Sequence, residues 1–210
     1  MDGLWKVERV TMGEMSMTPI GRWIALAPDQ TQVSGNGYLR HSNGVWQYNP
    51  ADSTLLIEDY NGIDEGFGPF KVDYKTNNMS WTREENGEQI NVILVRANDI
   101  PAAPSDSLVG LWDLATVIQN GKDVSMAVDS SNTAYLHLRW DRNFRQTFNK
   151  DSDSYGVYQP HGHRTTVYFI NNNSRDEYSY EFNDEDLILS LTNPEDTVSY
   201  IFERSNEFPE

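Results

Sequence analysis

Apolar and polar residues alternate along most of this chain with a period of two. In the clearest run, Tyr178, Tyr180 and Phe182 alternate with polar residues. Such alternation places one face of a β-strand on a core and the other in water. A helical period is weak throughout, and residues 22–27 are the one stretch that suggests a helix, although the matching residues 135–139 look like a strand. The pattern predicts an all-β protein.

Short clusters of asparagine and glycine separate the alternating runs. Pairs such as Asn86-Gly87 and Asn120-Gly121 tolerate the positive φ that tight hairpin turns demand. Their spacing predicts about eight short strands in each half of the chain, which is typical of an antiparallel barrel or sandwich. A closed barrel also removes the unpaired edge strands that invite aggregation.

The two halves of the chain repeat one another, with offsets that differ by a few residues in loop-like sequence. The matching segments are residues 3–5 with 110–112, 44–46 with 156–158, and 90–96 with 198–204. Repetition of this kind indicates that one structural unit occurs twice. We interpret the chain as a duplication.

A proline-containing segment lies between the two repeats. Residues 98–107 include Pro101 and Pro104 among small and polar residues. Proline donates no backbone hydrogen bond and cannot continue a central strand. The sequence therefore predicts a first barrel over residues 1–97, a short, semi-rigid linker over 98–107 and a second barrel over 108–210.

Each repeat opens with a glycine and a tryptophan, and its last strand ends on an arginine. The residues are Gly3, Trp5 and Arg96 in the first half, and Gly110, Trp112 and Arg204 in the second. This arrangement resembles the calycin signature of lipocalins and their relatives, and the whole chain looks like two bacterial lipocalin-like domains in tandem. The resemblance implies two small antiparallel lipocalin-like β-barrels, each closed at one end by the tryptophan with the arginine packed across its ring. That contact is worth about 0.5–2 kcal/mol, and strand parity places each arginine on the core face. On this reading the six residues are structural, and a barrel this small can be filled by its own side chains.

Charge and composition narrow the possible partners. The formal net charge is −16, and so acidic a surface repels phosphate backbones, which disfavours nucleic-acid binding. The sequence contains no cysteine, so disulfides and cysteine-ligated metals are excluded. No apolar run approaches the roughly 18 residues that a membrane span needs. If Met1 replaces a removed leader, we expect a periplasmic or secreted protein.

His161 and His163 are the best metal-binding candidates, because alternate residues of a strand point the same way. The proline and glycine beside them indicate a loop, and a third ligand, Asp151 or Asp153, would have to come from across a turn. Residues 149–154 match only the first part of a calcium loop, because its required glycine is missing. We expect a solvated histidine loop, an acidic hairpin turn, and neither metal nor other cofactor.

Paired carboxylates are numerous, but they lie in or beside predicted turns, where acidic side chains are usually solvated. They are Glu58-Asp59, Asp64-Glu65, Glu84-Glu85 and Asp184-Glu185-Asp186. The sequence contains no nucleophile-elbow, metalloprotease or phosphate-binding glycine motif. We expect no enzymatic activity and assign no catalytic residue.

Surplus aromatic residues are the remaining candidates for a binding site. Those assigned to ligand binding are Trp46, Tyr48, Phe70, Tyr158 and Tyr168. Many such residues fill cores, but any that face outward offer a platform for a ligand or a partner. We expect a non-enzymatic binding protein whose tandem barrels capture a small apolar or amphipathic ligand. The alternative is a protein-interaction or scaffold module of the bacterial cell envelope with side-chain-filled barrels and an apolar external patch.

Overall fold

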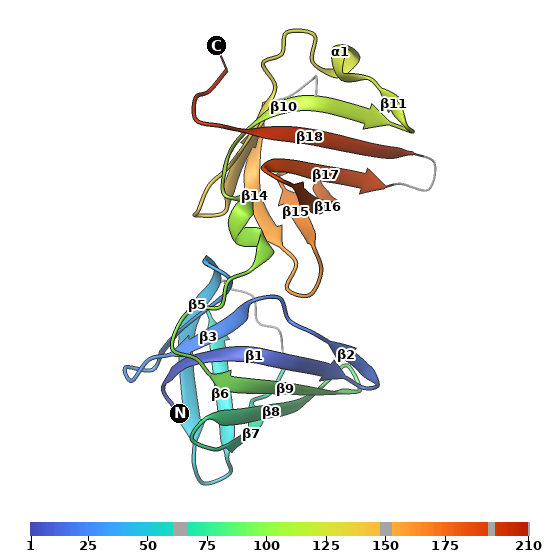
Figure 1. Ribbon diagram of the computed structural model, residues 1–210. Helices are drawn as coiled ribbons and strands as arrows, with labels where there is room; N and C mark the ends of the chain where they lie inside the picture. The colour runs from blue at the N-terminus through green and yellow to red at the C-terminus, as the bar shows by residue number, and fades with distance from the viewer. Residues whose placement is uncertain (61–66, 148–152, 193–195, 210) are drawn as a thin grey trace. The chain divides into compact units, whose positions relative to one another are not determined.

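The computed structural model describes residues 1–60, 67–147, 153–192 and 196–209. Contacts between Cα atoms divide the chain into two compact units, Met1–Asp106 and Ser107–Glu210. Each unit is an antiparallel β-barrel (Figure 1). The predicted tandem of all-β barrels is therefore confirmed.

The first barrel is closed by eight strands. They are β1 (Gly3–Met12), β3 (Arg22–Leu26), β4 (Thr31–Asn36), β5 (Leu39–Asn49), β6 (Thr54–Asp59), β7 (Phe70–Tyr74), β8 (Asn78–Glu85) and β9 (Glu88–Arg96). Each strand pairs with the next in this order, and β9 pairs back with β1 to close the ring. A short additional strand, β2 (Met15–Met17), forms a hairpin with the end of β1.

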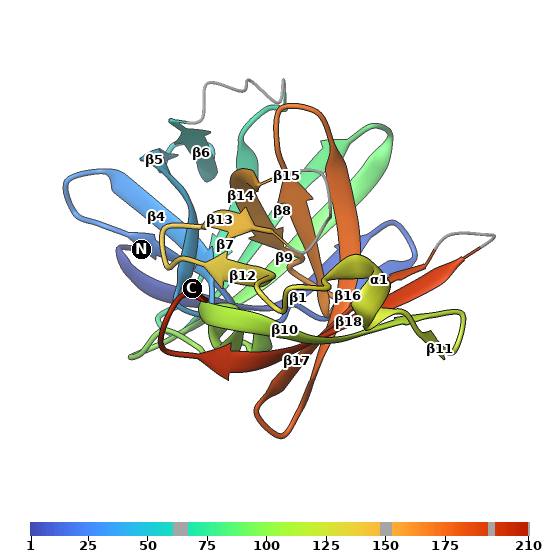
Figure 2. The same cartoon turned by 90° about the horizontal axis from the view of Figure 1, so that it is seen from above.

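The second barrel repeats this topology. Its closing strands are β10 (Gly110–Gln119), β12 (Tyr135–Leu138), β13 (Asn143–Gln146), β14 (Ser154–Pro160), β15 (Thr166–Ile170), β16 (Arg175–Asn183), β17 (Asp186–Thr192) and β18 (Thr197–Ser205). Strand β18 lies beside β10 and closes the ring (Figures 1 and 2). The short strand β11 (Lys122–Asp123) pairs with the end of β10, as β2 does with β1.

Two local differences from the sequence expectations are clear. The suggested helix at residues 22–27 is wrong: these residues form β3, which is hydrogen-bonded on one side to β1 and on the other to β4. A one-turn helix, α1 (Ser125–Val128), was not expected, and it follows a turn in which Asp123 accepts hydrogen bonds from the backbone and hydroxyl of Ser125. No helix among the described residues has the length and apolar character needed to cross a bilayer.

The duplication extends to local irregularities and turns. The pairing register shifts between Val7 and Arg9 in β1, and at the equivalent place, between Leu114 and Thr116, in β10. Such a bulge lets a strand bend as a small barrel closes. The predicted Asn-Gly turns at residues 86–87 and 120–121 have positive φ at both positions, which confirms them.

Each barrel is closed at one end by the expected tryptophan–arginine pair. Arg96 Cζ lies 4.3 Å from the ring centre of Trp5, and Arg204 Cζ lies 4.3 Å from that of Trp112. Both indoles are buried, and each donates Nε1 to the backbone carbonyl four residues earlier, at 2.8 and 2.9 Å. The packing implied by the signature is therefore present in both units.

The glycine of the signature has a steric explanation. Gly3 and Gly110 have φ of +126° and +156°, and a Cβ atom built at either one would collide with the guanidinium of the paired arginine. Glycine alone accepts both the backbone angle and this close approach. The glycine, tryptophan and arginine thus form one packing unit.

The segment expected to link the barrels is partly anchored. The 3-10 helix η1 (Pro104–Leu108) follows Ala103, which is buried. The carboxylate of Asp106 accepts hydrogen bonds from the backbone N–H groups of Tyr38, at 2.6 Å, and Ala103, at 2.8 Å. These bonds hold Asp106 against the turn between β4 and β5 of the first unit.

Candidate ligand-binding site

Large apolar side chains fill the middle of each barrel. In the first, Trp5, Leu55 and Leu94 are fully buried and belong to one core cluster. In the second, Leu136 and Leu187 are fully buried. The space open to a ligand therefore lies at the mouth of each barrel, which is the end remote from the tryptophan–arginine pair.

Trp46 and Tyr158, two of the predicted ligand-binding residues, occupy equivalent positions with equivalent bonds. Trp46 Nε1 donates to the carbonyl of Ala27 at 2.9 Å, and the Tyr158 hydroxyl donates to the carbonyl of Arg139 at 2.7 Å. Tyr158 is fully buried, whereas Trp46 is partly buried against the first core. In both barrels this aromatic residue ties strand β5 or β14 to the turn that follows β3 or β12.

The other three predicted ligand-binding residues lie in different surroundings. Tyr48 and Phe70 are partly buried against the first core. Tyr168 lies on the second barrel, where Arg175 Cζ covers its ring at 4.2 Å from the centroid. The five residues thus spread over both barrels and are not brought together.

The mouth of the first barrel carries a stacked arginine. Arg83 Cζ lies 4.1 Å from the ring centre of Phe70 and 5.0 Å from that of Phe67. The Arg83 guanidinium also pairs with Glu85 at 2.5 Å, and its side chain is only 17% exposed. A cation held between two aromatic rings and an acid closes this side of the mouth.

Polar side chains occupy the facing strands of the first barrel. Gln32 Nε2 donates to Asp59 Oδ1 at 2.5 Å and to Ser42 Oγ at 3.2 Å, and the Ser42 hydroxyl also donates to Asp59. Gln32 is 2% exposed. Its amide nitrogen is thus held by internal bonds.

The second barrel has a hollow at its mouth, which we call the β14–β15 hollow. Pairing between β14 and β15 ends at Val157 and Ile170, while β14 continues beside β13 to Ser154. The strands part there and leave a hollow of about 700 Å³. Its lining includes Gln146, Ser154, Tyr155, Val157, Ile170, Asn171 and Asp176.

A glycine lies at the last close contact between these two strands. A Cβ atom built at Gly156 would collide with the carbonyl oxygen of Ile170, and at the equivalent Gly44 it would collide with that of Glu58. The sequence match between the two glycines therefore reflects close strand approach in both barrels.

Gln146 is the most buried residue of the hollow's lining. It is 9% exposed, and its Oε1 has no hydrogen-bond partner among the described residues. A buried polar atom without a partner costs about 1–3 kcal/mol, so native proteins usually supply one from water or a ligand. Nearby, Asn171 Nδ2 donates to Ser154 Oγ at 3.2 Å, and Asn171 Oδ1 accepts from the backbone of its own turn.

Acidic groups dominate the charge of the hollow. Asp153 is held by Arg145 through bonds of 2.8 and 2.6 Å, which keep the pKa of Asp153 below its ordinary value. Asp176 accepts a hydrogen bond from Ser174 Oγ at 2.9 Å. Burial raises the pKa of Tyr178 and of Tyr200, and the charge of Asp176 contributes to both shifts.

Apolar side chains share the hollow with these polar groups. Tyr155 is 72% exposed and Val157 is 42% exposed, and Ile170 is half-buried beside them. Hydrophobic surface next to a few oriented polar groups is the usual composition of a small-molecule site.

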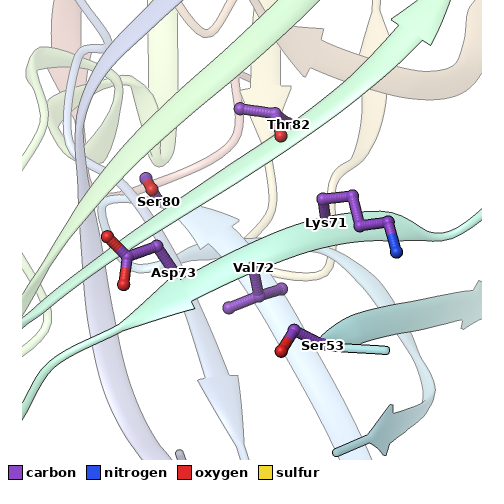
Figure 3. A pocket seen from close by; sticks show the side chains of 6 residues that line it. All are labelled: Ser53, Lys71, Val72, Asp73, Ser80 and Thr82. Atoms are coloured by element: carbon purple, nitrogen blue, oxygen red, sulfur yellow. The ribbon is translucent and has the colours of Figure 1, made fainter. Parts of the chain in front are cut away.

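A second, smaller hollow lies on the outer face of the first barrel. It has a volume of about 310 Å³ and is lined by Ser53, Lys71, Val72, Asp73, Ser80 and Thr82 (Figure 3). Figure 3 shows Lys71 and Asp73 extending away from one another along β7, and Lys71 Nζ donates to the carbonyl of Asp52 at 2.9 Å. Hydroxyls and an already bonded ammonium offer little apolar contact, so this hollow is the weaker candidate.

The histidine pair lies in the turn between β14 and β15. His161 Nδ1 accepts a hydrogen bond from the His163 backbone at 3.0 Å, and His161 Nε2 lies 3.3 Å from Arg164. Burial and then the charge of Arg164 lower the pKa of His161. Of the suggested third ligands, Asp153 is paired with Arg145, and Asp151 lies outside the described residues, as does most of the suggested calcium loop. The described part of the chain contains no group of three acidic or histidine side chains arranged to hold a metal.

Sequence reasoning did not single out Gln146 or Asp176. An isolated glutamine carries no motif, and Asp176 is one of many acidic residues near turns. A parity argument could have found both, because each lies an even number of residues from a buried core position on its strand: Phe144 and Tyr178. The sequence signal for both residues is a polar side chain near the end of a strand, on the face that otherwise carries buried core residues.

Comparison with known proteins adds no assignment. No protein-family model matches the chain, and no curated protein resembles it closely enough to be counted as a relative. The fold itself, two closed eight-stranded antiparallel barrels in tandem, fits a lipocalin-like architecture.

Proposed function

We propose that this protein is a non-enzymatic binding protein of bacterial lipocalin-like ancestry, whose second barrel captures a small amphipathic ligand. The observation that carries the proposal is the β14–β15 hollow, whose lining combines Gln146, buried and without a partner for its oxygen among the described residues, with apolar side chains at the outer rim. A ligand with an apolar part and a polar group would satisfy both kinds of surface.

The lipocalin-like ancestry is supported by the signature and its contacts. Glycine, tryptophan and arginine recur in both halves, and the same arginine-over-indole packing closes both barrels. Fold resemblance alone does not assign a function. The functional proposal therefore rests on the hollow.

The first barrel serves in this proposal as a filled, structural unit. Arg83 stacks at its mouth between two phenylalanines, and the internal polar groups Gln32, Ser42 and Asp59 bond to one another. Gln32 Oε1 is buried without a partner among the described residues, as Gln146 Oε1 is, but Gln32 lines neither of the two hollows.

A protein-interaction role is the second candidate, and one observation favours it. Trp140, in the turn between β12 and β13, is 77% exposed. Exposed tryptophan is a frequent anchor of protein interfaces. Native mass spectrometry of protein purified from its source separates the two roles, because a bound small molecule and a bound protein add very different masses.

The ligand-binding proposal is tested with the neutral fluorescent amphipath N-phenyl-1-naphthylamine. Its fluorescence rises on transfer from water to an apolar site, so titration gives its affinity for the wild-type protein. Tyr155→Ala removes an aromatic contact worth about 0.5–1.5 kcal/mol, so we expect binding about 2–10-fold weaker. Tyr38→Ala is the matched control, because Tyr38 is 69% exposed on the first barrel and Tyr155 is 72% exposed on the second.

Equal weakening by both substitutions would place the probe on general surface aromatics and not in the hollow. No saturable binding to the wild-type protein would overturn the proposal for neutral amphipaths.

A further inference from the structure

The charge of the hollow bears on the kind of ligand, and this inference rests on the proposed function. The described lining contains two carboxylates, Asp153 and Asp176, and no basic side chain. Arg145 neutralises Asp153 through two hydrogen bonds. The remaining formal charge in the lining is that of Asp176.

Asp176 has no cationic partner within the described part of the chain. It accepts one hydrogen bond, from Ser174 Oγ at 2.9 Å. The neighbouring Arg175 is directed elsewhere, since its guanidinium covers the Tyr168 ring at 4.2 Å. A half-buried carboxylate without a countercharge favours a ligand that supplies one.

Two hydrogen-bond acceptors in the lining also bear on the kind of ligand. Gln146 Oε1 is an acceptor without a donor, and the Asp176 carboxylate is an acceptor by nature. The amide nitrogen of Asn171 is already used by Ser154, and its oxygen by the turn. An ammonium group, which has three donors and no acceptor, complements these two acceptors on the inner face of the hollow.

The apolar side chains of the same hollow indicate what the remainder of the ligand should be. Val157 and Ile170 are the last paired residues of β14 and β15, and together with Tyr155 they lie on the outer face of the sheet, at the rim of the hollow. An alkyl or aryl group that extends outward from the ammonium would reach these side chains at the rim. The net charge of −16 attracts such a cation over a distance.

We infer that the β14–β15 hollow binds an organic cation of the primary-amine class, with its ammonium held by Asp176 and Gln146 on the inner face and its apolar part extending toward Val157 and Ile170 at the outer rim. Charge-assisted hydrogen bonds are about twice as strong as neutral ones, so the amine is preferred to an alcohol of the same length. A carboxylate of that length is repelled by Asp176.

Isothermal titration calorimetry with three matched probes tests this inference: hexylamine, 1-hexanol and hexanoate, at pH 7 and low salt. A hydrogen bond to a charged group contributes about 1.5–3 kcal/mol, so we expect hexylamine to bind about tenfold or more tighter than hexanol. Raising the salt concentration should weaken hexylamine binding and leave hexanol binding unchanged.

Two substitutions that each remove one negative charge make the test specific to the hollow. Asp176→Asn should reduce the preference for hexylamine over hexanol to about threefold or less, because only neutral hydrogen bonds remain. Asp73→Asn changes the net charge equally but lies on the first barrel, in the hollow of Figure 3, and should leave the preference intact. Hexanol binding and thermal unfolding check that each variant is folded.

The possible outcomes separate the two proposals. Equal binding of hexylamine and hexanol, with hexanoate no weaker, would refute the cation inference and leave the hollow as a site for neutral amphipaths. Absence of binding by all three probes would count against the hollow as a ligand site altogether. A preference lost equally in Asp73→Asn and Asp176→Asn would show long-range attraction without a site.

Discussion

At the mouth of the first barrel, Arg83 lies between Phe67 and Phe70 and pairs with Glu85. At the equivalent strand position the second barrel has Leu191, and its mouth carries the β14–β15 hollow. The opposite ends of the barrels agree closely, down to 4.3 Å between arginine and indole in both. The two copies therefore kept the end that holds the barrel together and diverged at the end that meets solvent.

The comparison separates residues that maintain the fold from residues that are free to change. The closing end is constrained by three groups that fit only together: a glycine, an indole and a guanidinium. The mouth has no such mutual constraint, because loops and strand ends tolerate substitution. A new binding surface in one copy is the expected result of a duplication under these constraints.

The largest expected effect comes from removing one closing tryptophan. Trp5→Ala should lower the free energy of unfolding of the first barrel by about 3–5 kcal/mol, because it leaves a cavity under Arg96. The second barrel should keep its own transition, and Trp112→Ala should give the mirror result. Differential scanning calorimetry of both variants checks this. A single joint transition, shifted equally by either substitution, would show that the barrels do not unfold independently.

A smaller effect distinguishes the two buried glutamines. Gln32→Leu removes the amide that donates to Asp59 and Ser42, and we expect the first barrel to lose about 1–3 kcal/mol. Gln146→Leu removes an oxygen without a partner, so the second barrel should be unchanged or up to about 1 kcal/mol more stable. Urea unfolding of the two variants measures both values. Equal destabilisation would mean that the Gln146 side chain makes hydrogen bonds comparable to those of Gln32 Nε2.

The closing ends could be predicted from the sequence because a period of two determines which side chains share a strand face. Leu94 and Arg96 are two residues apart, so the arginine had to lie on the core side, near the tryptophan paired with it. Trp46 and Tyr158 were recognised as matched aromatics. Their bonds to the carbonyls of Ala27 and Arg139 could not be predicted, because these depend on the path of the turn after the preceding strands.

The β14–β15 hollow could not be predicted because it arises from the point at which strand pairing stops. That point depends on the turn at residues 171–174, where Asn171 bonds to its own backbone and to Ser154. In the sequence, these residues read as one more polar turn. The candidate site thus depends on local backbone geometry, whereas the fold depends on periodicity and spacing.

A third prediction concerns the stacked arginine of the first mouth. Arg83→Ala should lower the stability of the first barrel by about 1–2 kcal/mol, through loss of cation–π contacts with two rings and a partly buried ion pair. Arg40→Ala, at an exposed position of the same barrel, serves as control and should change stability little. Calorimetry of the two variants provides the measurement. Equal effects of the two substitutions would show that the contacts of Arg83 do not stabilise the first barrel.

The smallest effect at neutral pH should become visible in alkali. Burial raises the pKa of Tyr178 and Tyr200, with Asp176 contributing, while the equivalent positions of the first barrel hold Phe70 and Val92, which do not ionise. Because the unfolded chain gives up these protons first, from a pH of about 10, the stabilisation is fully present below that pH. It is lost as the pH rises toward the folded-state pKa values.

Calorimetry across this range should show the second barrel losing stability that the first retains, and Tyr178→Phe should reduce the loss. If Tyr178→Phe leaves the alkaline loss unchanged while the wild-type barrels fall together, the tyrosines are not the groups that titrate, and the difference between the two interiors has no consequence for stability.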